Sequence, residues 1–187
     1  MEKKYSIAML PPESIIAWVK SMKEQLYKEI GWFHSKNSVG HITICEFMAN
    51  DATLEIVKNR LIKLCDGLEP VEISLTGFNS FPNGAFFMEP DEISKKKLIP
   101  IMKQVHKTLS LLSLKKSINP HLSIARGLDS EELKKANQLF TTIDLCFLCE
   151  SMVLREFDEN MHQFFVTDTF KFNNNPKNPA FVQGTLF

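Results

Sequence analysis

Two tetrapeptides of the same kind, about half a chain apart, constrain the fold more than any other feature of the sequence. His41-Ile-Thr-Ile44 and His121-Leu-Ser-Ile124 both run histidine, apolar, hydroxyl, apolar. Side chains alternate between the two faces of a β-strand, so each histidine shares a face with the hydroxyl two residues further on. If both strands belong to one sheet, two imidazoles and two hydroxyls come to one wall of a cleft, with apolar residues behind them.

Helix and strand patterns alternate along the rest of the chain. Helices are expected after Pro11-Pro12 with Ser14 as cap, after Asn50 or Asp51, over 98–112, and from Asp129 or Ser130. Strands are expected at 4–10, 41–48, 71–78, 85–88, 121–125, near 143–154 and near 162–172. This mixed order, with one histidine strand in each half, predicts an α+β fold of two similar lobes. Residues 1–172 are expected to form a single bilobal domain and residues 173–187 a C-terminal tail.

The composition excludes several classes of protein. Lys plus Arg and Asp plus Glu both number 22, which argues against a protein that clamps long nucleic acid by charge alone. A small nucleotide or an RNA end remains possible. No apolar run approaches the 18 or so residues that span a bilayer, and the apolar stretch near the N-terminus stops at Pro11-Pro12, too early for a signal sequence. A cytoplasmic protein without membrane contact is expected.

The four cysteines lie in apolar segments, which predicts buried, reduced thiols. Cys146 and Cys149 spell C-x-x-C, but a zinc site needs a second pair at comparable spacing, and the sequence has none. No metal site is expected there.

The paired tetrapeptides suit one kind of chemistry. In-line displacement at phosphorus needs a base on the attacking oxygen and an acid on the leaving oxygen, on opposite sides of the phosphate. Histidine titrates near neutrality and can serve in either role. The hydroxyls of Thr43 and Ser123 can donate hydrogen bonds to the non-bridging oxygens. The pattern therefore predicts a phosphate site with His41 and His121 as catalytic residues and with neither metal nor cofactor.

Other residues of suitable type receive less weight. His106 begins a third His-x-Thr, but it lies in a helical pattern and is expected on a helix surface, whereas His34 and His162 are expected in loops or at strand edges. Alternation turns Glu46 away from the catalytic face. Four phenylalanines could stack a base, although core packing is the expected role of each: Phe47, Phe78, Phe81 and Phe86. Lys115 and Lys116 could meet a second phosphate but are expected to be solvated.

Three stretches carry a resemblance to a known family: His41-Ile-Thr-Ile44, the segment 75–88 with its Phe81-Pro-Asn-Gly84 turn, and Asn119-Pro-His-Leu-Ser-Ile-Ala-Arg126. The chain resembles the 2H phosphoesterase superfamily, in particular bacterial 2′–5′ RNA ligases or RNA 2′,3′-cyclic phosphodiesterases. The similarity runs from the first strand to Phe172. Cys45-Glu46-Phe47 departs from the usual pattern, and Ser123 stands where threonine is commoner.

The resemblance implies a bilobal fold whose sheets line a central groove. It implies His41 and His121 as acid and base, with Thr43, Ser123 and Arg126 on the phosphate. Strict alternation would turn Arg126 away from the face of His121, so this role requires a bend at the end of the strand.

The implied partner is an RNA end or a small nucleotide with a 2′,3′-cyclic phosphate or a 2′–5′ linkage, handled by a monomer. Two alternatives stay open. One is a non-catalytic module that binds a nucleotide or an RNA end. The other is a phosphoesterase for ADP-ribose cyclic phosphate or oligoadenylate.

Overall fold

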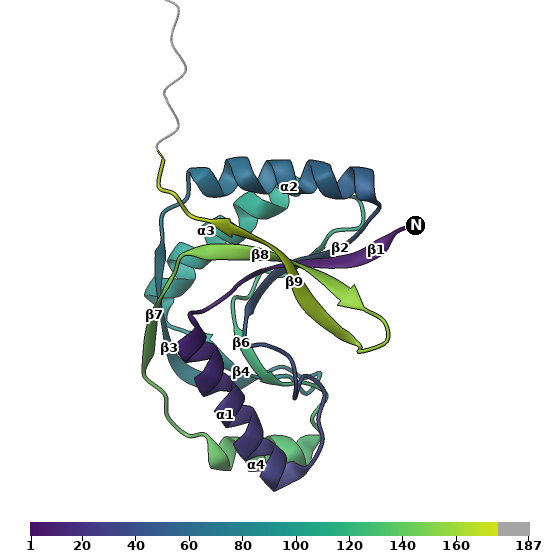
Figure 1. Ribbon diagram of the computed structural model, residues 1–187. Helices are drawn as coiled ribbons and strands as arrows, with labels where there is room; N and C mark the ends of the chain where they lie inside the picture. Colours follow the sequence, from purple (N-terminus) through teal and green to yellow (C-terminus); the bar gives the residue numbers. More distant parts are fainter. Residues whose placement is uncertain (176–187) are drawn as a thin grey trace, which may run out of the picture.

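The computed structural model describes residues 1–175, which form four helices and one strongly curled nine-stranded sheet (Figure 1). The helices are α1 (Glu13–Ile30), α2 (Asp51–Asp66), α3 (Glu92–Leu109) and α4 (Ser130–Leu139). The strands are β1 (Lys3–Met9), β2 (Ile42–Ala49), β3 (Val71–Ser80), β4 (Phe86–Pro90), β5 (Lys115–Lys116), β6 (Leu122–Ala125), β7 (Leu145–Cys149), β8 (Ser151–Asp158) and β9 (Gln163–Lys171). The predicted α+β fold is confirmed.

The sheet order shows two halves that meet in the middle. The strands run β7-β3-β4-β6-β2-β1-β8-β9, with β5 beside β2, and every pairing is antiparallel. The halves join at β2 and β6, where the register is set by Ile42 opposite Leu122. Figure 1 shows α1 and α4 together at one end of the molecule and α2 and α3 at the other. The two halves thus share a continuous sheet, and its central seam holds both histidine motifs.

Local signals fix most of the helix ends. Asn50 caps α2 by accepting a hydrogen bond from the Thr53 amide, and Asp129 begins α4 with a reciprocal capping box to Glu132. The prediction of Ser14 as a cap was wrong. Pro12 occupies the cap position of α1 without a side-chain hydrogen bond, so Ser14 lies inside the first turn.

The single strand expected near 143–154 is two strands. The strand is interrupted at Glu150, so that β7 pairs with β3 in one half and β8 pairs with β1 in the other. Neither glycine nor proline lies between Leu145 and Leu154, so no strong turn signal marks the junction. Their separation is therefore set by which neighbouring strands they join.

The cysteine prediction was correct for three residues and wrong for one. Cys45, Cys65 and Cys149 are buried thiols, but Cys146 is exposed on β7. An odd spacing of three residues along a strand turns Cys146 and Cys149 to opposite faces.

The end of the described chain is tied to α2. The side chains of Asn173 and Asn175 donate to the Asp66 carboxylate at 3.0 and 2.7 Å. Most of the predicted tail, 176–187, lies outside the described residues. Within 1–175, no helix is both long and apolar enough to cross a membrane.

Candidate active site

The seam between β2 and β6 brings the two motifs together. With Ile42 opposite Leu122, the antiparallel ladder sets His41 against Ser123 and Thr43 against His121. The four polar side chains therefore belong to one face of the sheet, while Ile42 and Leu122 are buried behind it. His41 and Ser123 are almost fully covered, and Thr43 and His121 are half-buried.

Both imidazoles are oriented in the same way by their own backbone. The Nδ1 atom of His41 lies 2.6 Å from the carbonyl oxygen of Val39, and Nδ1 of His121 lies 2.8 Å from that of Asn119. A carbonyl only accepts, so each Nδ1 must carry the proton. In the neutral rings, Nε2 is then the nitrogen that can accept a proton, which is the atom needed for acid–base work.

His121 lies against an aromatic wall. The ring of Phe81 meets it edge-on with centroids 5.1 Å apart, and that of Phe87 lies at 4.8 Å. The other predicted stacking candidates pack in the core, as expected: Phe47 and Phe86 are buried, and Phe78 stacks on Phe86. Phe81 alone among the four touches the candidate site.

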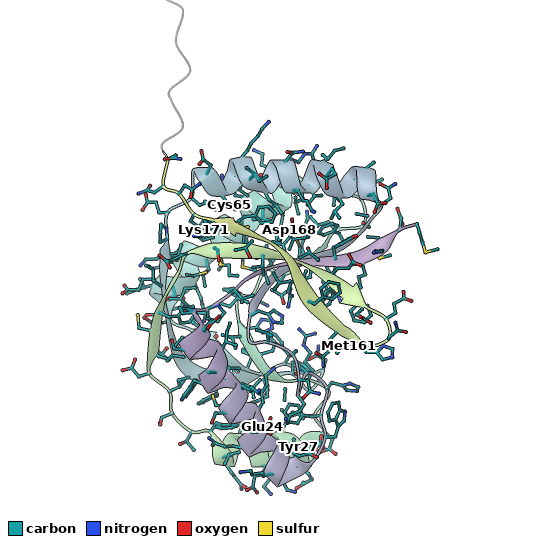
Figure 2. All side chains as sticks on the ribbon, in the orientation of Figure 1. Glu24, Tyr27, Cys65, Met161, Asp168 and Lys171 are labelled. Atoms are coloured by element: carbon teal, nitrogen blue, oxygen red, sulfur yellow. The ribbon has the colours of Figure 1, made fainter. Side chains whose placement is uncertain are left out.

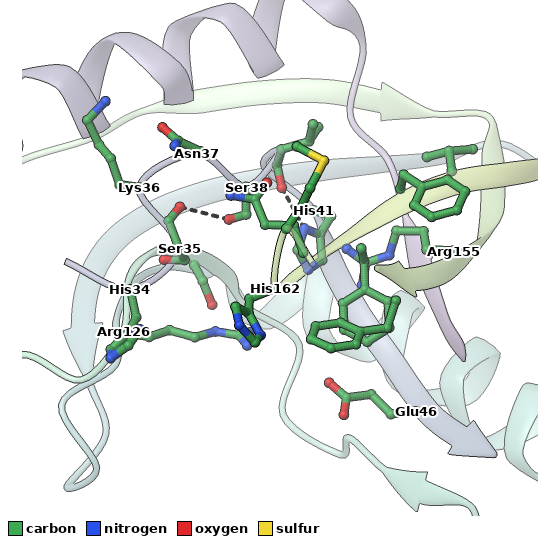
Figure 3. Close-up of a pocket in the computed structure, with 18 of the residues that line it drawn as sticks. His34, Ser35, Lys36, Asn37, Ser38, His41, Glu46, Arg126, Arg155 and His162 are labelled. Carbon is green, nitrogen blue, oxygen red and sulfur yellow. Dashed lines mark hydrogen bonds between the residues drawn. The ribbon is translucent and has the colours of Figure 1, made fainter. Parts of the chain in front are cut away.

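A cavity of about 670 Å³ opens beside His41, between the loop that precedes β2 and the β8–β9 hairpin. This volume suits a nucleotide-sized ligand. Figure 3 shows many of its polar side chains. Among its lining residues are His41, Ser123 and Arg126, together with His34, Glu46, Arg155, Phe157, His162 and Phe164. Thr43 and His121 lie on the same face of the sheet but are not part of this lining, so the cavity extends from the seam away from His121.

Arg126 leaves the strand in the way its expected role requires. β6 ends at Ala125, and the Arg126 amide then donates to the His34 carbonyl at 3.1 Å. The next residue, Gly127, has a φ of 69°, a left-handed conformation that glycine adopts without strain. The turn brings the Arg126 side chain into the cavity with Ser123.

A β-bulge overturns the prediction for Glu46. On β1, Ile7 and Ala8 are consecutive, but their partners on β2 are Cys45 and Thr43, so Ile44 is an extra residue. The bulge interrupts alternation and turns Glu46 to the same face as Thr43. Glu46 accordingly lines the cavity, where its carboxylate pairs with Lys4 at 2.9 Å.

The backbone at the bulge is hydrogen-bonded by a residue that was wrongly expected on a helix surface. His106 of α3 is buried, and its Nε2 lies 2.9 Å from the carbonyl oxygen of Ile44. The same oxygen accepts from the Ser117 amide at 2.9 Å. The carbonyl of the bulged residue thus has two donors, one from α3 and one from the residue that follows β5.

Arg155 was missed by the sequence analysis. It projects from β8 into the cavity and is only 5% exposed. Its Nη2 donates to the Ser6 hydroxyl at 2.8 Å, and its guanidinium carbon lies 5.2 Å from the centre of the Phe164 ring. An arginine directly after the apolar run Met152-Val-Leu154 was the one available signal.

Burial and nearby cations act on both histidines. Burial holds the pKa of His41 well below its usual value, with Arg155 adding repulsion. Burial also lowers the pKa of His121, with a smaller contribution from Arg126. Both rings therefore favour the neutral form in the free protein, and an anion that compensates the arginines would favour protonation.

The loop before β2 is anchored by a buried lysine. Lys23 of α1 is 1% exposed, and its Nζ donates to the carbonyl oxygens of Ser35 and Ser38 at 2.8 and 2.7 Å. Burial lowers the pKa of Lys23 to about 7. This anchor fixes the segment that supplies the Val39 carbonyl to His41.

The remaining candidates take the positions expected of them. His34 and His162 lie in a loop and in a turn, although both line the cavity. Figure 2 places Met161, the neighbour of His162, at the tip of the β8–β9 hairpin. Lys115 and Lys116 are exposed on β5. Within residues 1–175, no three His, Cys, Asp or Glu side chains gather so as to hold a metal ion.

Comparison with known proteins gives the family. The model of the 2′–5′ RNA ligase superfamily matches residues 11–160, which is most of the chain. The chain belongs to the 2H phosphoesterase superfamily. A Staphylococcus haemolyticus protein named for phosphoesterase activity is 30% identical over 139 residues, covering 70% of this chain and 79% of the relative.

Solved structures of low sequence identity share the fold of this 2H phosphoesterase. LigT of Escherichia coli, complexed with 3′-AMP, is 8% identical with a TM-score of 0.69, covering 92% of this chain and 99% of that chain. The TT0787 protein of Thermus thermophilus is 16% identical with a TM-score of 0.63, at 91% and 98% coverage. Usb1 of Kluyveromyces marxianus is 15% identical with a TM-score of 0.55, at 90% and 98% coverage.

Proposed function

We propose that this phosphoesterase hydrolyses 2′,3′-cyclic phosphates or 2′–5′ phosphodiesters at RNA ends or on small nucleotides, without a metal ion. The observation that carries the proposal is the matched pair of imidazoles across the β2–β6 seam, each with Nδ1 bonded to its own backbone and with Nε2 left for proton transfer. Two histidines with Thr43 and Ser123 on one face supply a base, an acid and donors for one phosphate.

In the proposed reaction, water attacks the phosphorus of a 2′,3′-cyclic phosphate. His121 takes the proton of that water, and the bond from phosphorus to the 3′-oxygen breaks. His41 gives its proton to that oxygen, and the product carries a 2′-phosphate. With a 5′-hydroxyl in place of water as the nucleophile, the same step breaks the same bond to the 3′-oxygen and joins two ends by a 2′–5′ linkage.

The assignment of His121 as base and His41 as acid follows the family resemblance. Because its pKa is depressed, His41 is neutral in the free protein and must gain a proton when substrate binds in order to act as the acid. A phosphate near Arg126 supplies the negative charge for this, because it compensates a cation that opposes protonation of His41. Thr43, Ser123 and Arg126 are proposed as the phosphate ligands.

The test is a substrate panel with EDTA present throughout. It contains the four nucleoside 2′,3′-cyclic phosphates, RNA oligomers with matched 2′,3′-cyclic and 2′–5′ ends, ADP-ribose cyclic phosphate and oligoadenylate. Turnover of the first two groups, lost in the His41→Ala/His121→Ala double variant, supports the proposal. Turnover of the last two compounds alone would redirect it to another nucleotide. Turnover that is absent in EDTA and appears when a divalent ion is added in excess of the chelator would reject the metal-free scheme.

A binding module is the second candidate, since LigT has been crystallised with 3′-AMP and with NADP⁺. It predicts tight nucleotide binding that His41→Ala leaves unchanged, with no product formed by the wild type. Measuring turnover and calorimetric binding on the same preparation separates the two.

A further inference from the structure

Arg155 is a buried cation without an anionic partner. Among residues 1–175, no carboxylate lies within ion-pair distance of its guanidinium, and its Nε has no hydrogen-bond acceptor. Glu46 on β2 and Arg155 on β8 both pair in register with Ser6 between them, but the Glu46 carboxylate is paired with Lys4 at 2.9 Å. Removing a guanidinium from water is unfavourable unless charge and hydrogen bonds are supplied in return. An anionic ligand in the cavity would supply both.

The guanidinium is held in place before any ligand arrives. Ser6 accepts one N–H at 2.8 Å, and the Phe164 ring lies against the guanidinium at 5.2 Å. Ser6 and Arg155 are also register partners across β1 and β8. A fixed guanidinium loses little freedom when it binds an oxyanion, and its remaining N–H groups match two phosphate oxygens.

The position of Arg155 separates it from the phosphate between the histidines. That phosphate is expected over the seam of β2 and β6. The hydrogen bond to Ser6 holds the Arg155 guanidinium over β1, on the side of β2 away from β6. In Figure 3, Arg126 lies on one side of His41 and Arg155 lies on the other. The cavity runs from His41 in this same direction and ends at the β8–β9 hairpin.

We infer that Arg155, held by Ser6 and Phe164, binds a second phosphate of the substrate. At an RNA end that carries a 2′,3′-cyclic phosphate, the neighbouring phosphate lies on the 5′ side of the same terminal nucleoside. The preferred substrate class is therefore a nucleoside cyclic phosphate that also bears a 5′-phosphate, as every RNA end does. This inference rests on the proposed function and names the substrate class of that site.

The experiment compares a nucleoside 2′,3′-cyclic phosphate with the same compound carrying a 5′-phosphate. For the wild type, the 5′-phosphate should raise kcat/KM roughly tenfold or more, mainly through KM, as expected for a hydrogen-bonded charge. Arg155→Gln should remove this advantage, so that its kcat/KM values for the two compounds become equal. Arg155→Lys should retain part of it, and Ser6→Ala should reduce it while keeping the charge.

Lys36→Gln is the matched control, because Lys36 is another cation that lines the cavity but is paired with Glu24. It should keep the full advantage of the 5′-phosphate. If Arg155→Gln leaves the ratio of the two kcat/KM values unchanged, whether or not both values fall, the inference is overturned. Circular dichroism of each variant identifies one that has not folded, and Arg155→Lys and Ser6→Ala then decide the matter.

Binding measurements keep this inference separate from the proposed hydrolysis. Calorimetry on the wild type should give a lower Kd for adenosine 3′,5′-bisphosphate than for adenosine 3′-monophosphate, and Arg155→Gln should make the two equal. If the wild type hydrolyses neither ester but shows this difference, the proposed function fails and the second-phosphate subsite stands. Equal affinities in the wild type would reject the subsite whatever the turnover.

Discussion

At the scale of single residues, the proposed chemistry depends on two imidazoles that differ in their surroundings. His41 is enclosed beside Arg155 and Arg126, whereas His121 lies half-exposed against Phe81 and Phe87. Burial lowers the pKa of both, and more strongly for His41. The two rings are therefore equivalent in backbone geometry but not in electrostatics.

Replacement of either histidine by alanine should lower the rate on the natural ester by roughly 10²–10⁴, the usual range for a lost acid or base. The double variant should lose much less than the product of the two, because the residues act as a unit. A nitrophenyl ester needs little help from an acid, so it should rescue His41→Ala and not His121→Ala. Rescue of His121→Ala instead would reverse the roles, and full activity of either variant on the natural ester would show that the paired motifs are not the catalytic centre.

The pH profile should report the depressed pKa values. Catalysis needs one neutral and one protonated imidazole, and kcat/KM reflects the free enzyme. Since both pKa values lie below the ordinary 6.5, kcat/KM should peak on the acid side of 6.5 and fall as both rings lose their protons at higher pH. The phosphate of bound substrate raises both pKa values, so the kcat profile should be displaced to higher pH. Coincident profiles centred above pH 7 would contradict this account.

At the scale of elements, backbone detail at the ends of strands decides which side chains reach the cavity. The bulge at Ile44 turns Glu46 toward it, and the turn after β6 does the same for Arg126. Gly84 supports that turn. Its carbonyl accepts from the Leu128 amide at 3.0 Å, and its φ of 78° is in the left-handed region.

Two glycines with the same φ of 78° allow the contact at Gly84 to be tested. A Cβ on Gly84 would lie 2.2 Å from the Leu128 carbonyl oxygen, whereas one on Gly31 would meet no atom within 4 Å. Gly31→Ala should therefore cost only the backbone conformation, with φ at 78° and ψ at −151°, which is roughly 1–3 kcal/mol. Gly84→Ala should cost clearly more, because backbone must move. Urea unfolding of both variants measures the difference, and similar losses would show that the turn adapts freely.

Elements with local signals were predicted well, and elements with distant partners were not. Strand alternation sufficed for His41 with Thr43, and a capping box marked the start of α4 at Asp129. By contrast, the bulge at Ile44 has partners distant in the sequence, since His106 and Ser117 both donate to the Ile44 carbonyl. The break at Glu150 and the inward direction of Arg155 are likewise set by which strands lie alongside. Such partners leave no periodic trace in the sequence.

At the scale of the whole molecule, the proposed phosphate site bridges the two halves of the sheet. Thr43 and His41 come from the β2 side of the seam, and Ser123, His121 and Arg126 from the β6 side. A ligand that contacts both sides of the seam can bind only the folded state, because only folding brings the two sides together. It should therefore stabilise the entire domain and not one half of it.

Inorganic phosphate should raise the thermal midpoint accordingly. At a free concentration of about a hundred times Kd, the stabilisation is about 2.7 kcal/mol. For a chain of this size that corresponds to roughly 5–10 °C. Arg126→Gln, measured in the same buffers, should show a smaller shift, and sodium chloride at matched ionic strength should show little. Equal shifts in the wild type and Arg126→Gln would indicate a general salt effect.

The carbonyl contacts of Val39 and Asn119 affect how easily each histidine segment could be moved into another protein. In a Ser-His-Asp triad the histidine is oriented by a carboxylate from elsewhere in the fold, so the catalytic unit cannot be moved without its distant support. Here each imidazole is oriented by a carbonyl two residues earlier in its own chain. A graft of about five residues onto another antiparallel pair would carry the nitrogen proposed for proton transfer and its tautomer together, so this strand segment could serve as a self-sufficient module in enzyme design.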